Sequence, residues 1–225
     1  MTREELSAEL KNAGIATGDN RASHLLAQAE LDGIVCSGAV KDGKQTYALL
    51  EHRAPKAKPL SKAEALAALA GKYFASHGPA ALQDFVWWSG LSVGDAKLAL
   101  DMVQSDFVSE TIGAQTYWFA RRRSLPKTDE QSVYLLPAYD EFIISYKDRS
   151  AVLPFENHNK AVSNNGIFRP VIVVNGQVVG TWKRTIKKDR VSVETEFFKQ
   201  PNKTTKRLIE EASIRYGRFL EKQAG

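Results

Sequence analysis

The sequence predicts an α+β fold in which the first half of the chain repeats one plan and the second half is rich in strands. Residues 1–54 and 60–122 each show helical periodicity followed by two short apolar runs around a turn. From residue 131 the pattern changes to alternating strands and ends in one amphipathic helix. We therefore expect three domains, at 1–54, 60–122 and 131–225, in a chain of 225 residues that is long enough to bury a core in each.

The second repeat shows the plan most clearly. Its pattern predicts one helix over Lys62–Ser76, a short helix opened by Pro79, and a third helix that begins after Ser92. Two strand-like runs follow, Phe107–Ile112 and Gln115–Ala120, and a Gly-Ala turn joins them. Three helices followed by a hairpin is the order of a winged helix, a fold that often binds duplex DNA.

The first repeat has the same order of elements. Thr2 and Glu5 have the spacing of a capping box for a helix over Glu4–Ala13. A second helix is expected over Asn20–Asp32, and Asp42-Gly43 predicts the turn of a hairpin. The apolar face of that second helix consists of Ala22, Leu25, Leu26 and Ala29. We therefore predict two tandem winged-helix units.

The last part of the chain predicts an antiparallel sheet or small barrel with a covering C-terminal helix. The expected elements are strands over Val133–Pro137, Ile167–Val174, Gln177–Lys187 and Arg190–Phe198, and a helix over Thr204–Lys222. A two-residue turn at Lys188-Asp189 would place Lys183 opposite Glu194 in the neighbouring strand. Arg184 would then share the apolar side with Trp182 or lie at a domain seam.

The sequence also predicts buried positions among Trp87, Trp88 and Cys36. Trp87 and Trp88 follow core-facing residues of a helix, so at least one of them should be buried against a neighbour. Cys36 is the single cysteine, so the chain has no internal disulfide. Its place in a strand of the first hairpin favours a small buried side chain.

Charge is unevenly distributed along the chain. The net charge at pH 7 is +5, from 31 Lys and Arg against 26 Asp and Glu. Residues 1–58 carry 8 of each sign, residues 59–120 carry 3 cations and 6 carboxylates, and residues 121–225 carry 20 cations and 12 carboxylates. Because duplex DNA gains affinity from phosphate neutralisation, nucleic-acid contacts are expected to involve the last part of the chain.

The sequence lacks the signals of several other classes of function. No apolar run approaches the length of a membrane span, and a charged helix stands where a signal peptide would begin. We therefore expect a cytoplasmic protein with no membrane partner. His24, His52, His77 and His158 lack metal-ligand spacing, and no glycine-rich phosphate loop is present, so we expect no metal and no cofactor.

Five separated blocks of the sequence form a pattern of their own: Ala29–Gly33, His77–Ala80, Leu135–Glu141, Ser145–Ser150 and Val178–Arg184. In this order they resemble the AlkZ family of winged-helix DNA glycosylases. The resemblance implies tandem winged helices and a C-terminal β-domain. In family members it also implies hydrolysis of the N-glycosidic bond of alkylated or cross-linked purine nucleotides.

The resemblance further implies an N-terminal winged helix to which no residue of this sequence corresponds. In the family that module carries the catalytic motif, a Gln followed by an apolar residue and a Gln or Asp. Gln28-Ala29-Glu30 has a similar look, but it lies on a predicted amphipathic helix, which explains it without catalysis. No catalytic residue is therefore transferred, and a separate N-terminal catalytic domain is an expected partner.

Candidate DNA-binding residues lie on one predicted helix face and at predicted turns. Asn20, His24 and Gln28 share the polar side of a helix, flanked by Arg21, and can meet base edges or phosphates. The cationic candidates are Lys41 and Lys44 at the first wing tip, Arg121, Arg122 and Arg123 after the second repeat, and Arg184, Lys187, Lys188 and Arg190 in the last hairpin. The second wing tip is uncharged, so the second repeat is expected to serve as a structural spacer.

Asp140 is the one candidate for a catalytic acid. Neighbouring carboxylates such as Asp140 and Glu141 point to opposite faces of a strand, whereas a glycoside hydrolase needs two facing acids. Asp140 therefore has a better explanation as the cap of Glu141–Tyr146 or as a partner of Arg149.

The sequence thus predicts a protein that binds duplex DNA and is non-catalytic as this chain. One alternative is a DNA glycosylase whose catalytic module is missing or supplied separately. Another is a protein-interaction module without DNA affinity. Salt-dependent binding to a duplex distinguishes the last of these from the others.

Overall fold

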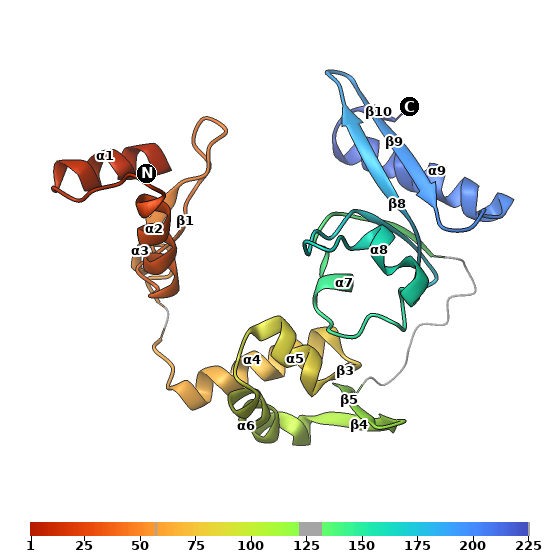
Figure 1. Ribbon diagram of the computed structural model, residues 1–225, viewed down its shortest axis with the longest axis horizontal. Helices are drawn as coiled ribbons and strands as arrows, with labels where there is room; N and C mark the ends of the chain where they lie inside the picture. Colours follow the sequence, from red (N-terminus) through yellow and green to blue (C-terminus); the bar gives the residue numbers. More distant parts are fainter. Residues whose placement is uncertain (57, 122–131, 225) are drawn as a thin grey trace. The chain divides into compact units, whose positions relative to one another are not determined.

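A computed structural model describes residues 1–56, 58–121 and 132–224 (Figure 1). These residues form helices and mainly antiparallel sheets, which confirms the predicted α+β class. The chain divides into two compact units, Met1–Leu60 and Ser61–Gly225. Within the described residues, no helix combines the length and the apolar character that crossing a membrane requires.

The first unit combines short helices with one hairpin. Its elements are α1 (Arg3–Asn12), α2 (Arg21–Leu31), β1 (Val35–Ser37), β2 (Tyr47–Leu49) and α3 (Leu50–Arg53). The predicted capping box begins α1. The Thr2 hydroxyl accepts the Glu5 N–H at 3.2 Å, and the Glu5 carboxylate accepts the Thr2 N–H at 2.8 Å. Two otherwise unpaired N–H groups are thereby satisfied at the helix start.

The hairpin of the first unit has the predicted turn at Asp42-Gly43, where both residues have positive φ. The core of this unit is smaller than predicted. Leu25 on α2 is 37 % exposed, Cys36 is half-buried, and α1 buries none of its side chains. Ala22 and Leu26 remain the buried positions of α2.

The second unit begins with helices and a three-stranded antiparallel sheet of order β3-β5-β4. The elements are α4 (Lys62–His77), β3 (Ala80–Ala81), α5 (Leu82–Ser89), α6 (Val93–Val103), η1 (Gln104–Asp106), β4 (Phe107–Ile112) and β5 (Gln115–Ala120). The predicted Gly113-Ala114 turn joins β4 and β5. Pro79 does not open a helix, contrary to the prediction, because the chain first pairs with β5 and α5 begins only at Leu82.

The helical core of the second unit includes one face of α6, where Ala96, Ala99 and Leu100 are buried. Neither tryptophan is buried as predicted: Trp87 is 50 % exposed and Trp88 is half-buried. Their indole N–H groups explain the difference, since each donates to a hydrogen bond at the edge of this core. Trp87 donates to the Ile144 carbonyl, and Trp88 donates to the Glu141 carboxylate.

The rest of the second unit is built on a five-stranded sheet of order β10-β9-β8-β7-β6. Its elements are β6 (Val133–Leu136), α7 (Glu141–Ile144), η2 (Phe155–Asn157), α8 (His158–Ala161), β7 (Val171–Val174), β8 (Gln177–Ile186), β9 (Arg190–Phe197), α9 (Lys203–Phe219) and β10 (Gln223–Ala224). Of the two predicted alternatives the open sheet is present, because β10 and β6 are the ends of the strand order. The sheet is not wholly antiparallel, since β10 pairs parallel with β9. The predicted register of β8 with β9 is confirmed: Lys183 lies opposite Glu194, and Arg184 opposite Val193.

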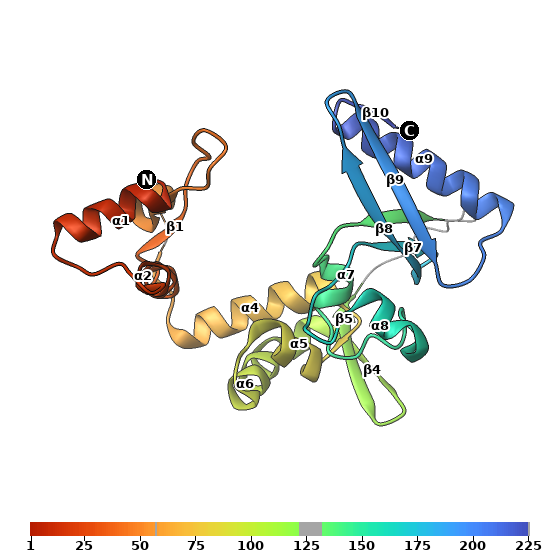
Figure 2. The same cartoon turned by 45° about the horizontal axis from the view of Figure 1, so that its top comes forward.

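Both faces of the five-stranded sheet are covered. Alternating residues of β7 point to opposite sides, so Val171 and Val173 join a core with α7 and α8, while Ile172 joins a core with α9 (Figure 2). Ile209 and Ala212 of α9 are buried in that second core. Phe219, the last residue of α9, is 81 % exposed although Tyr216 and Gly217 in the same turn are packed.

The segment that contains α7 is tied to α4 and α5 by buried polar contacts. The Asp84 side chain is 5 % exposed, and its carboxylate accepts the Ala81 and Lys147 N–H groups, both at 2.9 Å. The Tyr73 hydroxyl donates to the Ser145 carbonyl at 3.0 Å. Because each of these groups is paired, the desolvation cost of burial is offset and the segment is held in one position.

Candidate nucleic-acid interface

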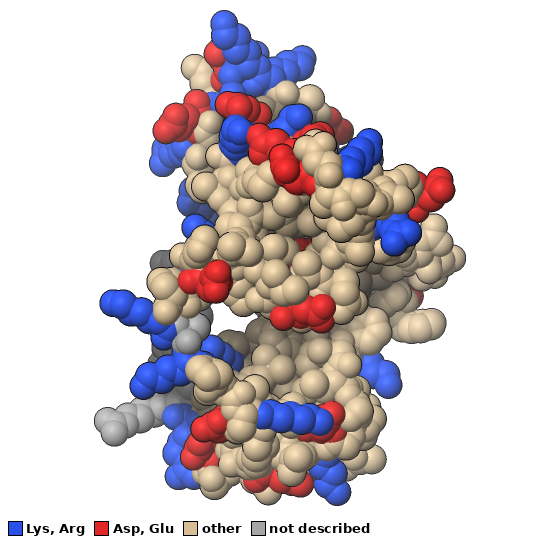
Figure 3. Space-filling view, turned by 90° about the vertical axis from the view of Figure 1, so that its left-hand side faces the viewer, with Lys and Arg blue, Asp and Glu red and all other residues tan. Residues whose placement is uncertain are grey.

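The tip of the β8–β9 hairpin carries exposed cations on both sides of its turn. Lys187, Lys188 and Arg190 are all exposed, and the Lys187 N–H closes the turn on the Arg190 carbonyl at 2.8 Å. None of the three forms an ion pair with a carboxylate in the described part of the chain. In the space-filling view, Lys and Arg side chains gather at the upper end, where Figure 1 places this hairpin tip (Figure 3).

Lys222 adds a fourth cation that sequence reasoning missed. Its ammonium group donates to the Lys188 carbonyl at 2.6 Å, although 34 residues separate the two. The contact arises because Gln223 pairs with Arg190 in the parallel β10–β9 ladder. No local signal reports this pairing, so only the tertiary structure brings Lys222 to the tip.

Farther down the hairpin, Lys183 and Arg184 have the predicted register, and their side chains are exposed. The side chains of Lys183 and Glu194 do not reach ion-pair distance in the described residues, although their backbones are opposite each other. Arg184 lies on the side of Trp182, as expected, since both contact Tyr216 of α9, but its side chain is exposed. Its guanidinium donates to the Tyr216 hydroxyl and lies 5.9 Å from the centre of that ring, because β8 extends past the buried Trp182 toward α9.

The tip of the β1–β2 hairpin, the predicted first wing tip, has its cations already paired. The Lys41 ammonium lies 2.6 Å from a Glu5 carboxylate oxygen, and that of Lys44 lies 3.7 Å from Glu4. The hydrogen bonds from Lys41 and from the Thr2 N–H lower the pKa of Glu5, so this carboxylate stays ionised. The two wing cations are thus partly neutralised by α1 before any phosphate approaches.

The candidates on α2 are exposed and share one side of the helix. Arg21, His24 and Gln28 are spaced by three and four residues, which aligns them along one face. Asn20 lies just before the helix with φ of 61° and makes no capping hydrogen bond, so the predicted helix starts one residue later. Gln28 is engaged by Asp32, whose carboxylate accepts its amide N–H at 2.8 Å.

Arg121 follows β5 and is exposed. Arg122 and Arg123 lie outside the described residues. Of these three predicted DNA-binding arginines, the structure therefore describes only Arg121, directly after β5.

Asp140 caps a helix, which is the first of the two structural roles predicted for it. Its carboxylate accepts the Phe142 N–H at 2.9 Å and thereby caps α7. The predicted alternative, a pair with Arg149, is absent from the described contacts. The Arg149 guanidinium instead donates to the Ile143 carbonyl at 2.8 Å and to the Lys147 carbonyl at 3.2 Å.

The neighbouring Glu141 has a different environment. Its Oε2 accepts the indole N–H of Trp88 at 3.1 Å and the hydroxyl of Ser145, and it lies 3.4 Å from Nε2 of His77. The Ser145 hydroxyl first, and then Trp88 and His77, lower the pKa of Glu141. Its side chain nevertheless stays 63 % exposed. Sequence reasoning missed this arrangement because Trp88 is 53 residues away.

Comparison with known proteins identifies the family. A family model of AlkZ-like DNA glycosylases matches residues 1–219. The chain belongs to the AlkZ-like DNA glycosylase family. Its fold is similar to the solved structure of Streptomyces sahachiroi DNA glycosylase AlkZ, with a TM-score of 0.73 and 18 % identity over 100 % of this chain. The chain spans 63 % of the length of that protein, and no curated protein matches it.

In this AlkZ-like chain, four of the five sequence blocks that carried the resemblance lie in the second unit and contact one another in pairs. The Tyr146 hydroxyl donates to the His77 carbonyl at 2.7 Å, which joins two of the blocks. The Trp182 indole N–H donates to the Leu136 carbonyl at 2.7 Å and joins two more. A side chain at Gly78 would place its Cβ 2.7 Å from Cα of Phe119, so that position is limited to glycine. The blocks therefore build the scaffold around α7.

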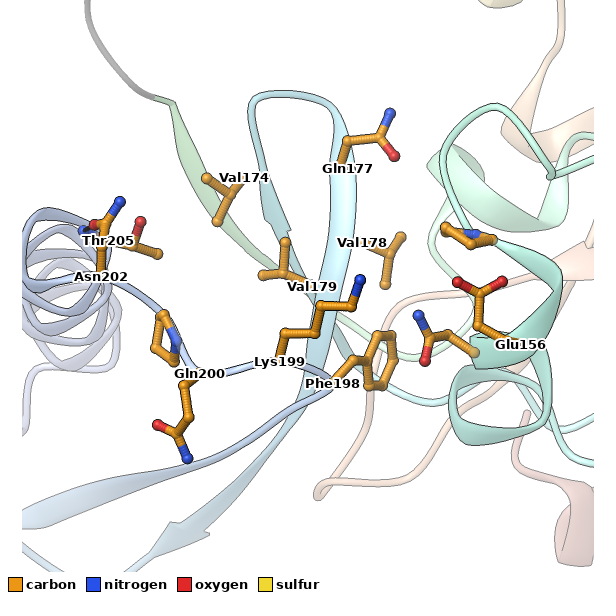
Figure 4. Close-up of a pocket in the computed structure, with 13 residues that line it drawn as sticks. Glu156, Val174, Gln177, Val178, Val179, Phe198, Lys199, Gln200, Asn202 and Thr205 are labelled. Carbon is orange, nitrogen blue, oxygen red and sulfur yellow. Dashed lines mark hydrogen bonds between the residues drawn. The ribbon is translucent and has the colours of Figure 1, made fainter.

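A pocket of about 360 Å³ lies at the opposite end of β8 from the cationic tip (Figure 4). Val178 and Phe198 form an apolar wall, and Lys199 and Glu156 bring one charge of each sign to it. Such a lining suits a small molecule with both apolar and polar groups. Within the described ranges, no group of His, Cys, Asp and Glu side chains is arranged to hold a metal ion.

Proposed function

We propose that this chain binds duplex DNA, chiefly through the tip of the β8–β9 hairpin. The observation that carries the proposal is the group of exposed cations at that tip, where Lys187, Lys188 and Arg190 make no ion pair in the described residues and Lys222 joins them. Cations of this kind contact phosphates without reading bases. Membership of a DNA glycosylase family supports DNA as the partner.

We also propose that the two helical regions are winged helices within domains 1–54, 60–122 and 131–225. The order of elements supports this, since α1 and α2 precede the β1–β2 hairpin and α4, α5 and α6 precede the β4–β5 hairpin. In this proposal the polar face of α2, with Asn20, Arg21, His24 and Gln28, is a second DNA contact. The α4–α6 region serves as a spacer.

Binding of the full chain to a fluorescent duplex at several salt concentrations tests the DNA proposal. If about four phosphates are neutralised, affinity should fall roughly tenfold for each doubling of salt, with little preference among sequences. Sequence-selective binding that persists at high salt would contradict this mode of binding. No measurable affinity for any duplex would instead favour a protein-interaction module.

We further propose that these residues alone do not release alkylated bases and that an N-terminal winged helix with the family's Gln motif supplies catalysis. The capping role of Asp140 supports this, because the carboxylate is occupied by the backbone of α7. Base release from a duplex that bears a methylated purine should be absent for the chain. It should appear when an N-terminal winged helix of a relative is fused or added. Turnover by the chain itself that disappears in Asp140→Asn would make Asp140 catalytic and overturn the proposal.

A further inference from the structure

The pocket at the far end of β8 lies between two segments that approach the start of that strand. Its floor is formed by Val178 and Val179 of β8. The segment 154–157 lies on one side of this floor, and the segment 198–202 with the start of α9 lies on the other (Figure 4). The Phe198 N–H donates to the Val179 carbonyl at 2.9 Å, which joins the second side to the floor. The pocket is therefore built within the second unit and on its sheet.

Two polar side chains in the wall of this pocket are buried without full hydrogen bonding. Thr205 is 7 % exposed, and its hydroxyl makes no hydrogen bond within the described residues. Asn157 is 8 % exposed, and its side-chain oxygen accepts the Lys160 ammonium at 2.9 Å, so its amide N–H groups remain. Buried polar groups are normally paired. These two are therefore available to a polar group that enters the pocket.

The N-terminus of α9 adds further hydrogen-bond donors to the same side of the pocket. The Asn202 side chain caps the helix by accepting the Thr205 N–H at 2.8 Å. The N–H groups of Lys203 and Thr204 have no acceptor among the described residues, as is usual at a helix start. The first turn of α9 contains no carboxylate, and Lys199 brings an ammonium group to the pocket wall. This side therefore favours an anion.

We infer that this pocket binds a small carboxylic acid with a compact apolar body. The carboxylate accepts the Thr205 hydroxyl and the free N–H groups at the start of α9, beside Lys199. The apolar body covers the floor of β8 and contacts Phe198. Glu156 and the Asn157 amide lie on the other side of the floor, and repulsion by Glu156 directs the charged end of the ligand toward α9 (Figure 4). A volume of about 360 Å³ suits such a molecule.

Titration of the full chain, followed by the NMR signals of the ligand, tests the inference with three probes. 3-Phenylpropanoate combines a carboxylate with an apolar ring, 3-phenylpropanamide keeps the shape without the charge, and acetate keeps the charge without the ring. The chain should bind 3-phenylpropanoate about tenfold more tightly than either of the others. Equal affinity for the amide would contradict the anion site, and equal affinity for acetate would contradict the apolar floor. Absence of binding by 3-phenylpropanoate at millimolar concentration would overturn the inference.

Thr205→Val assigns the binding to the pocket. The variant removes the hydroxyl but keeps the shape of the side chain and the backbone N–H that Asn202 caps. Affinity for 3-phenylpropanoate should fall about fivefold, whereas the melting temperature should stay equal or rise, because an unpaired buried hydroxyl does not stabilise the fold. A purely structural role of Thr205 would instead lower the melting temperature. The neighbouring Thr204 is exposed, and Thr204→Val is the matched control that should keep full affinity.

Two charge variants should act in opposite directions. Lys199→Gln should weaken binding of 3-phenylpropanoate about threefold, and Glu156→Gln should strengthen it about twofold. Lys183→Gln, which removes an exposed charge outside the pocket, should leave it unchanged. These variants decide the inference even if Thr205→Val does not fold. Unchanged affinity in both Thr205→Val and Lys199→Gln would show that the acid binds elsewhere and would overturn the inference. No probe contains DNA, so the proposed DNA binding stands or fails independently.

Discussion

Two hairpins that each turn over two residues use their cations in opposite ways. At Asp42-Gly43 the flanking Lys41 and Lys44 are paired with carboxylates of α1. At Lys188-Asp189 the flanking cations are free of ion pairs in the described residues, and Lys222 comes beside them. Two basic hairpin tips therefore differ in the charge that they offer to a phosphate.

The difference originates in the elements that pack beside each tip. The first turn of α1 carries Glu4 and Glu5, as favoured by the helix dipole and the capping box. Those same carboxylates lie within reach of the first wing. Beside the β8–β9 tip lies the end of α9, where cations are favoured at a helix C-terminus and Arg218 and Lys222 follow that preference. Counting cations near a turn thus does not measure the charge available there.

The largest expected effect follows from removing the free cations. Replacing Lys187, Lys188 and Arg190 together by Ala should weaken duplex binding roughly a hundredfold at low salt and reduce the salt slope by about three. Fluorescence anisotropy over a range of salt concentrations measures both. Replacing Lys199, Lys203 and Lys206 by Ala changes the net charge equally. If that control loses as much affinity, net charge rather than the tip would account for binding.

A smaller effect of opposite sign is expected from releasing the wing cations. Glu4→Gln with Glu5→Gln removes the partners of Lys44 and Lys41 and should tighten duplex binding about fivefold. Gln at position 5 still serves the capping box, so α1 should remain folded. Glu9→Gln with Glu30→Gln removes the same charge from exposed residues without ion pairs in the described structure. Equal tightening by both pairs would show that the local pairing is irrelevant.

Removing the wing cations themselves should have less effect still. Lys41→Ala with Lys44→Ala should weaken duplex binding by less than about threefold, since their charge is already partly neutralised and exposed ion pairs contribute little. The same anisotropy titration measures the change. If this variant lost as much duplex affinity as the variant of the β8–β9 tip, the paired lysines of the β1–β2 hairpin would be as important for binding as the unpaired cations, and the expected difference between the two tips would be wrong.

The smallest expected effect is on the melting temperature at acidic pH, through the ionisation of Glu5. Interaction with Lys41 and the Thr2 N–H lowers the pKa of Glu5 in the folded chain, so the resulting stabilisation is complete above the ordinary carboxyl range. It is lost as the pH falls through the lowered pKa. The melting temperature of the chain should therefore decline slightly more steeply with acid than that of Glu5→Gln. Identical acid profiles would indicate that the pair does not stabilise the fold.

The sequence by itself determined the local features of this protein. Capping at Thr2 depends on residues three apart, and the turns at Asp42-Gly43 and Asn175-Gly176 depend on residue types that accept positive φ. The turn at Lys188-Asp189 follows from its place between two strand-like runs. Once the last turn was placed, the register of Lys183 with Glu194 followed from the two-residue loop. Each of these features is set by short-range hydrogen bonds and backbone sterics, which a single sequence displays.

The tertiary structure alone decided which side chains are available for function. Leu25 and Phe219 have the right spacing for a core, but their exposure depends on what covers them. The pairing of Lys41 with Glu5, the arrival of Lys222 at the hairpin tip and the fixing of Glu141 by Trp88 each join residues more than 30 positions apart. Such contacts depend on how whole elements pack, because burial and electrostatics act through space and are independent of the order along the chain.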